Sequence, residues 1–340
     1  MAVLRKNYLG IDVSKPWFDV SLLVVLDHLK QAMITERFDN NAAGMKLFKK
    51  WLKAQGISFD EHSLLVIENT GIYHRLIWSF CSTHHLQLHI GNAAHIKWSL
   101  GITRGKSDAI DSQRLCTYCC KQADELKLTP ALNPVFIKLK DLMSSRSRLL
   151  IQLHATKNYI NEIKSIHDIA LLAILEKAHK AAIDGIKKSI RQIEELINKI
   201  ITEDAAIYTN YQLIKTVPGI GHLTAVYIIC CTNNFVSKVS GKQLASYAGV
   251  VPFEHSSGIS IKGKNRVHKM ANKELKKMLH LCALTAIKYC PEFKHYFDRK
   301  KAEGKNGMLV VNAIKNKLVL RVVAVVNKQQ PYVENSKITA

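Results

Sequence analysis

The order of apolar runs in the N-terminal third limits the folds that this chain can adopt. Three short runs rich in β-branched residues come first, close enough together to pair as an antiparallel meander. A helical pattern, a strand, a second helical pattern, a further strand and a third helical pattern follow in that order. We therefore predict strands at residues 7–13, 19–26, 35–38, 64–67 and 86–90, and helices at 45–54, 72–81 and 107–120.

Four carboxylates occupy defined places in this order. Asp12 lies near the end of the first strand, and Glu68 follows the strand at 64–67. Asp108 and Asp111 are three residues apart, so they share one face of the third helix. Strands, helices and acids in this order are those of a ribonuclease H-like domain. The alternative is that the acids are ordinary helix caps and surface residues, but the ordered set of four favours a shared site.

Carboxylates gathered in this way predict a divalent metal site. They repel one another unless cations lie between them, and hard oxygen ligands select Mg²⁺ or Mn²⁺. Two such ions about 4 Å apart can stabilise the attacking and leaving oxygens of a phosphodiester. The predicted chemistry is therefore phosphoryl transfer on a nucleic acid.

The charge of the chain also favours a polyanion partner. Lys and Arg total 49 against 27 acidic residues, for a net charge of +22. We expect phosphate contacts from Arg104 and Lys106 beside the acids, and from a basic run after a serine pair. That run contains Lys262, Lys264, Arg266 and Lys269.

A Pro-Gly-Ile-Gly turn between two apolar helical stretches resembles a helix-hairpin-helix. Its glycines are Gly219 and Gly221. Backbone N–H groups at the start of the second helix can bind phosphate without reading base sequence. The alternative is a plain turn that uses glycine for its left-handed residues.

The middle of the chain is helical. Isoleucines at 186, 190, 193, 197 and 200 alternate at spacings of four and three, which indicates a heptad seam. The seam is either internal or between subunits. The fold class is thus α/β followed by mostly α, and a helix is also expected at 235–250. We divide the chain into an α/β domain at 1–130, a coiled-coil helical region at 131–208, a C-terminal domain at 209–330 and a tail at 331–340.

The chain has no apolar run of about 18 residues and no signal peptide, so we expect a cytoplasmic protein with no membrane partner. The eight cysteines lack the spacing of a zinc site, and we expect them to be reduced thiols.

Several motifs resemble those of one transposase family. They are Gly10-Ile-Asp-Val-Ser-Lys15, Glu68-Asn-Thr-Gly-Ile-Tyr-His74, Lys106-Ser-Asp-Ala-Ile-Asp111, Val217-Pro-Gly-Ile-Gly221, Tyr247-Ala-Gly-Val-Val-Pro252 and Ser257-Gly258 with the basic run after it. The chain resembles, nearly end to end, a transposase of the insertion-sequence one-ten family, in its one-one-one-one branch.

The resemblance implies a RuvC-like DEDD domain, a coiled-coil insertion and a C-terminal transposase domain. It implies that Asp12, Glu68, Asp108 and Asp111 bind Mg²⁺ and that Ser257 attacks the scissile phosphate to form a phosphoserine link. Ser256 remains an alternative nucleophile. The resemblance also implies a guide RNA from the element, donor and target DNA as substrates, and homodimers that assemble into a homotetramer on DNA.

Two other functions remain open at this point. A metal-dependent nuclease of the Holliday-junction type would cut by water and form no serine adduct. A non-catalytic nucleic-acid-binding protein would use the helix-hairpin-helix and the basic run alone.

Overall fold

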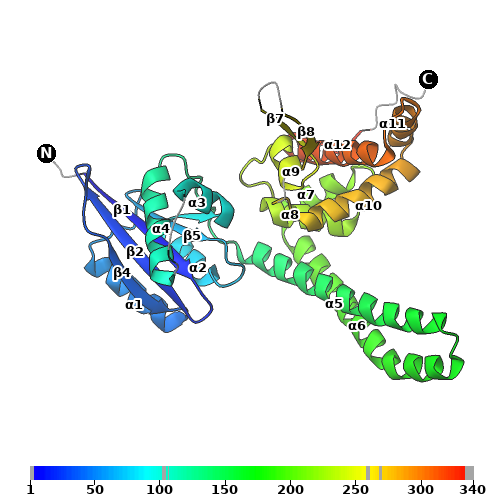
Figure 1. The fold of residues 1–340 in the computed structure, drawn as a ribbon, viewed down its shortest axis with the longest axis horizontal. Helices are drawn as coiled ribbons and strands as arrows, with labels where there is room; N and C mark the ends of the chain where they lie inside the picture. The colour runs from blue at the N-terminus through cyan, green and yellow to red at the C-terminus, as the bar shows by residue number, and fades with distance from the viewer. Residues whose placement is uncertain (1–3, 102–104, 106, 258–260, 268–269, 334–340) are drawn as a thin grey trace. The chain divides into compact units, whose positions relative to one another are not determined.

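The computed structural model describes residues 4–101, 105, 107–257, 261–267 and 270–333, with the backbone alone from 254 to 266. The chain forms two compact units, Met1–Asn133 and Pro134–Ala340 (Figure 1). The first is α/β and the second is mainly helical, in agreement with the predicted fold class.

The first unit is built on a mixed sheet. Strands β1 (Arg5–Val13), β2 (Trp17–Leu26) and β4 (Ile34–Asp39) form an antiparallel meander. Strands β5 (Ser63–Glu68) and β6 (Gln87–Gly91) continue the sheet parallel to β1. A short strand that was not predicted, β3 (Leu29–Lys30), pairs with the end of β2. The described strand order β3-β2-β1-β5-β6, with β4 also on β2, is consistent with a ribonuclease H-like domain.

Helices cover both faces of this sheet, which explains why β1 and β5 are apolar almost throughout. Helices α1 (Ala42–Ala54) and α2 (Arg75–His84) cover one face, where Phe18, Phe38 and Phe48 pack with ring centroids 5.4–5.6 Å apart. Helix α4 (Asp108–Gln122) covers the other face, with α3 (Ala93–Leu100) beside it. Helix α3 was not predicted, because Ile96 is its one buried residue and it has no clear apolar stripe.

The second unit begins with a long helical hairpin. Helices α5 (Pro134–Ser165) and α6 (Ile169–Glu203) run antiparallel, because Arg146 bonds Glu194 at one level and Lys164 pairs with Glu176 at another. The side chain of Asp168 caps α6 by accepting a hydrogen bond from Leu171 N at 2.9 Å.

The rest of this unit is a helical bundle with one β-hairpin. Its core includes the first turns of α5 and the last turns of α6. Helix α12 packs against α7, α9, α10 and α11. The elements are α7 (Ala205–Lys215), α8 (His222–Thr232), α9 (Gly241–Tyr247), β7 (Phe253–Ser257), β8 (Ile261–Arg266), α10 (Lys273–Tyr289), α11 (Pro291–Ala302) and α12 (Gly307–Lys328).

The predicted helix at 235–250 is wrong over its first part. Asn233, Asn234, Phe235 and Lys238 have positive φ, so the chain turns repeatedly after α8. Helix α9 begins only at Gly241, after a capping box formed by Ser240 and Gln243. The apolar spacing that suggested a longer helix comes from Phe235, which is buried by these turns.

None of the helices in the described ranges is long and apolar enough to span a bilayer.

Candidate active site

The first two acids lie side by side at the end of the sheet. Strands β1 and β5 are parallel with Ile11 opposite Ile67, so the next residues, Asp12 and Glu68, are neighbours at the carboxyl ends of the two strands. Side chains alternate between the faces of a strand, and both carboxylates therefore lie on the face covered by α4.

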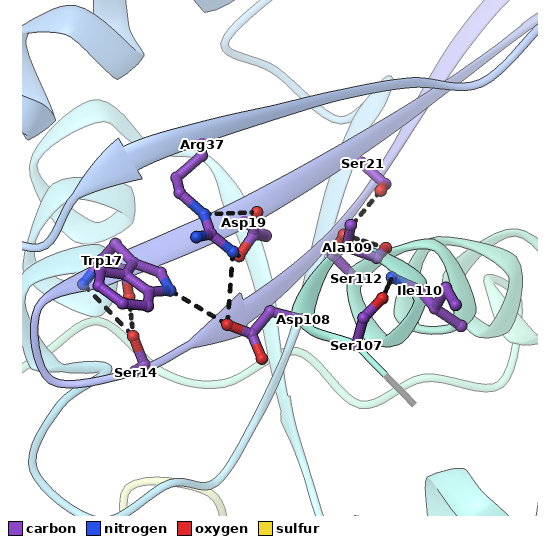
Figure 2. A network of polar contacts seen from close by, with 10 residues as sticks. All are labelled: Ser14, Trp17, Asp19, Ser21, Arg37, Ser107, Asp108, Ala109, Ile110 and Ser112. Carbon is purple, nitrogen blue, oxygen red and sulfur yellow. Dashed lines mark hydrogen bonds and ion pairs between the residues drawn. The ribbon is translucent and has the colours of Figure 1, made fainter. Parts of the chain in front are cut away.

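Helix α4 approaches this face unusually closely because of Gly10. A Cβ on Gly10 would lie 1.9 Å from the amide nitrogen of Cys116 and 2.3 Å from the carbonyl oxygen of Ser112. The thiol of Cys116 bonds the carbonyl oxygen of Tyr8, and the hydroxyls of Ser112 and Ser21 share a hydrogen bond of 2.8 Å (Figure 2). The close approach and these two hydrogen bonds fix α4 over the ends of the strands.

The start of α4 then adds the other two acids. Ser107 caps the helix by accepting a hydrogen bond from the backbone N–H of Ile110 at 3.3 Å (Figure 2). Asp108 and Asp111 follow in the first turn, where the helix dipole favours negative charge. The four predicted acids therefore come from two strand ends and one helix N-terminus of a single unit.

Asp12 is affected by its burial and by the charges of the other three acids. Burial raises the pKa of Asp12, and the negative charges of Asp108, Asp111 and Glu68 raise it further, to about 6. A carboxyl group with this pKa is stabilised as an anion once a cation joins the cluster.

Two arginines and a tryptophan, none of them predicted, bind the acids on α4. Arg37 donates two hydrogen bonds to Asp19, of 3.1 and 2.9 Å, and a weaker one of 3.4 Å to Asp108 (Figure 2). The indole Nε1 of Trp17 donates to the same Asp108 oxygen at 3.1 Å. On the next turn, Arg114 Nη1 donates to Asp111 Oδ1 at 2.8 Å.

The strand register places these partners in one row. Asp12 on β1 is opposite Asp19 on β2, and Asp19 is opposite Arg37 on β4. Paired residues in an antiparallel sheet point to the same face, so Arg37 can reach both Asp19 and the start of α4. The antiparallel meander predicted from sequence already made these strands neighbours. The contact of Arg37 with Asp19 could be predicted only once the pairing of individual residues was known.

A cavity of about 410 Å³ opens between the sheet, α3 and α4. Its charged lining residues are Asp12, Glu68, Asp111, Lys97 and Arg114. A cavity lined by both carboxylates and cations suits a phosphate ester whose scissile group is next to bound metal ions.

The donor set fits hard divalent cations, since the candidate ligands are all carboxylates. Within the part of the chain that the structure describes, no three Asp, Glu, His or Cys side chains converge as a metal site. Asp108 and Asp111 are instead paired with Arg37 and Arg114, and this arrangement lowers the charge of the cluster.

The structure describes only some of the predicted phosphate-binding residues. Arg104, Lys106 and Lys269 lie outside the described residues, and Lys262, Lys264 and Arg266 belong to β8, where the backbone alone is described. Gly219 has φ 82°, and a Cβ there would lie 2.4 Å from the carbonyl oxygen of Cys282, so packing against α10 explains this glycine. Gly221 is exposed and precedes the first residue of α8.

Ser257 is the last residue of β7. The hairpin pairs Ser256 with Lys262 and Ser257 with Ile261, and its register shifts between Phe253 and His255. The predicted nucleophile is therefore at the end of β7, and it is the last described residue before β8. It belongs to the second unit, whereas the four acids belong to the first.

Comparisons with known proteins agree with the motifs. The Transposase IS116/IS110/IS902 family model matches residues 211–298, and a DEDD transposase model of the IS110 group matches residues 9–164. The pilin gene-inverting proteins of Moraxella bovis and Moraxella lacunata are each 30% identical to the chain over 337 residues, which cover 97% of it and 98% of each relative. An uncharacterized 43.6 kDa protein of insertion element IS110 from Streptomyces coelicolor is 28% identical over 134 residues, which cover 39% of the chain and 32% of that protein.

The two models match both units, and the Moraxella relatives match over nearly the whole length. The acids lie within the segment matched by the DEDD model, and Ser257 lies within the segment matched by the other. The chain therefore belongs to the IS110 family of insertion-sequence transposases.

Proposed function

We propose that this protein is a metal-dependent DNA recombinase that cuts and rejoins strands through a serine nucleophile. The observation that supports it most is the placement of the acids: Asp12 and Glu68 are at neighbouring strand ends on the sheet face covered by α4, and Asp108 and Asp111 are in the first turn of that helix. A basic chain with such a cluster suits a DNA substrate.

The four acids would hold Mg²⁺ or Mn²⁺, which supplies positive charge beside the scissile phosphate. Asp12 and Glu68 would contribute from the rigid strand ends, and Asp108 and Asp111 from the first turn of α4. Arg37 and Arg114 orient the two helix acids, and Lys97 and Arg114 add positive charge to the cavity. Rigid placement of this kind is what phosphoryl transfer requires from a protein.

Ser257 would be the nucleophile. Its Oγ forms a bond to phosphorus while the deoxyribose oxygen of the cut strand leaves, and the hydroxyl proton passes to a base. The DNA end is then linked to the serine by a phosphodiester. A hydroxyl from another strand can therefore attack it, release the serine and complete strand exchange without ATP.

The partners follow from the family. We propose donor and target DNA as substrates, recognition of both through a guide RNA encoded by the element, and a homodimer that forms a homotetramer on DNA. The Moraxella relatives are described as inverting a pilin gene, which supports rearrangement of DNA by this chain. The α7–turn–α8 segment, with the exposed Gly221, would add a phosphate contact in the manner of a helix-hairpin-helix.

The test is a covalent-adduct assay. The full-length protein is incubated with the element RNA, Mg²⁺ and end-labelled DNA, and then denatured so that only covalent complexes migrate together. We expect an adduct with wild type and with Ser256→Ala, but none with Ser257→Ala or Asp12→Ala. Loss of the adduct in Ser256→Ala but not in Ser257→Ala would identify Ser256 as the nucleophile instead.

A second candidate is a metal-dependent junction nuclease. It is favoured by the location of all four acids in one compact unit, away from Ser257 in the chain. In that case water is the nucleophile, and cutting persists in Ser257→Ala with no adduct at any stage. The same assay thus separates the two functions.

A further inference from the structure

Lys315 is a lysine with a buried stem and no acid partner in the described residues. Its side chain belongs to α12 and is only 6% exposed. Its Nζ is not among the fully buried polar atoms that lack a partner within the described residues, so the ammonium reaches the surface at the end of a buried stem. No carboxylate in the described residues forms an ion pair with it.

A second lysine makes this environment more positive. Burial lowers the pKa of Lys315, and the positive charge of Lys276 on α10 lowers it further. No carboxylate contributes to this shift. The one acid in the first turn of α10, Glu274, instead acts on the hydroxyl of Tyr227. Two lysines on packed helices, with no acid acting on the first, form a site suited to an anion.

The two lysines belong to helices α10 and α12, which pack against each other, and both helices contact the segment that leads into β7. Asn312, almost one turn before Lys315, donates to the carbonyl oxygen of Val250 at 2.9 Å. Lys276 Cδ lies 3.7 Å from the place where a Cβ would stand on Gly249. Gly249 and Val250 belong to the segment that leads from α9 into β7.

Hydrogen bonds connect the segment before β7 with the segment after β8. The backbone N–H of Asn272 donates to the carbonyl oxygen of Tyr247 at 2.8 Å, and its side-chain Nδ2 donates to the Tyr247 hydroxyl at 2.9 Å. Asn272 also caps α10, one turn before Lys276. An anion bound by the lysines would therefore be held at a fixed position relative to the base of the hairpin.

We propose that Lys276 and Lys315 bind a backbone phosphate of the nucleic acid at the base of the β7–β8 hairpin. A phosphodiester is the anion that a chain of net charge +22 meets on its substrate. Bound there, the strand is anchored at the base of the hairpin whose far end contains Ser257. This inference rests on the proposed function only in taking a nucleic acid as the ligand.

The deciding variant is Lys315→Met, which keeps the length and the apolar stem of the side chain. A charge held on a buried stem beside a second lysine destabilises the free protein, whereas a bound phosphate needs that charge. We therefore expect a higher thermal unfolding midpoint without nucleic acid, together with weaker binding by about three- to tenfold. The slope of log affinity against log salt should become shallower by about one unit.

Binding is measured by fluorescence anisotropy with the full chain, in one arm with labelled duplex DNA and in another with the element RNA. A loss in the DNA arm identifies a substrate phosphate, and a loss in the RNA arm identifies a guide phosphate. Lys328→Met removes an exposed charge from the same helix and should change neither binding nor the unfolding midpoint appreciably.

Lys276→Met, with its exposed neighbour Lys277→Met as the matched control, repeats the test on α10. If Lys315→Met does not fold, Lys276→Met alone tests the phosphate site. Unchanged affinity in both arms for either folded variant of the pair would overturn the phosphate site. A wild type that binds both nucleic acids but forms no adduct would contradict the serine nucleophile and leave the phosphate site intact, so the two failures are distinguishable.

Discussion

Arg37 donates to Asp108 through Nη2, the same nitrogen that binds Asp19, so one guanidinium joins the central antiparallel strands to the N-terminus of α4 (Figure 2). The Asp19 side chain is 5% exposed and Arg37 is half exposed. The arginine therefore neutralises a buried acid and orients an acid of the candidate site at the same time.

Replacing Arg37 should destabilise the protein strongly. Arg37→Met leaves the carboxylate of Asp19 buried without its cation, and we expect a lower free energy of unfolding, measured by urea denaturation. Lys46→Met, an exposed lysine on α1, is the control for lost charge. The double variant Arg37→Met with Asp19→Leu should recover much of the loss, and equal stability of the single variant and wild type would contradict the account.

Asp12 should make stability depend on pH. Its pKa is about 6 in the folded chain against an ordinary 3.8, so the folded state binds the proton more tightly. The stabilising contribution is therefore complete below about pH 4 and disappears as the pH rises through 6. Partial exposure reduces the effect, and we expect ionised Asp12 to cost about 1–2 kcal/mol at pH 7.

Asp12→Asn tests this directly. In EDTA at pH 7.5 the variant should unfold at a higher temperature than wild type, and the change in stability between pH 4 and 6 should become smaller. Mg²⁺ should raise the midpoint of wild type more than that of the variant. Glu36→Gln, which removes an exposed acid from β4, serves as the control. A variant less stable than wild type in EDTA would show that the acids do not repel one another.

Gly10 should tolerate no side chain. Because a Cβ would meet the backbone of α4 at 1.9 Å, Gly10→Ala must push the helix off the sheet, and we expect a loss of about 3 kcal/mol or more. Asp108 and Asp111 would move with the helix, so cutting should be lost even where the variant folds.

Gly185→Ala is the matched control. This glycine lies in the middle of α6 with open space around it, and alanine there should add about 0.5–1 kcal/mol of stability through helix propensity. Equal unfolding midpoints for Gly10→Ala and wild type would contradict the close approach of α4 to β1.

The sequence was informative where function depends on local pattern. The positions of Asp12 and Glu68 could be predicted because each lies at or near the end of an apolar strand, and those of Asp108 and Asp111 because a spacing of three places them on one helix face. The partners Trp17 and Arg37 could not, since their contact with Asp108 joins residues 91 and 71 positions apart. The burial of Lys315 could not be predicted for the same reason, because a lysine in an apolar helix is expected to be exposed until its neighbours in the fold are known.

Helix boundaries were least predictable where turns bury apolar residues. Phe235 has positive φ and is nevertheless part of the core, so its apolar character gave a false helical pattern before Gly241. The strands of the β7–β8 hairpin could not be predicted from an apolar alternation, because Phe253–Ser257 and Ile261–Arg266 are mostly polar.

The most direct test of the central claim is to find the residue that becomes attached to DNA. The adduct formed by wild type with the element RNA and Mg²⁺ would be digested with nuclease and protease, and the modified peptide sequenced by mass spectrometry. We predict a single nucleotide remnant on the Oγ of Ser257, absent when Mg²⁺ is replaced by EDTA. Efficient cutting with no modified peptide, or a remnant on another residue, would contradict the assignment of Ser257 as the nucleophile.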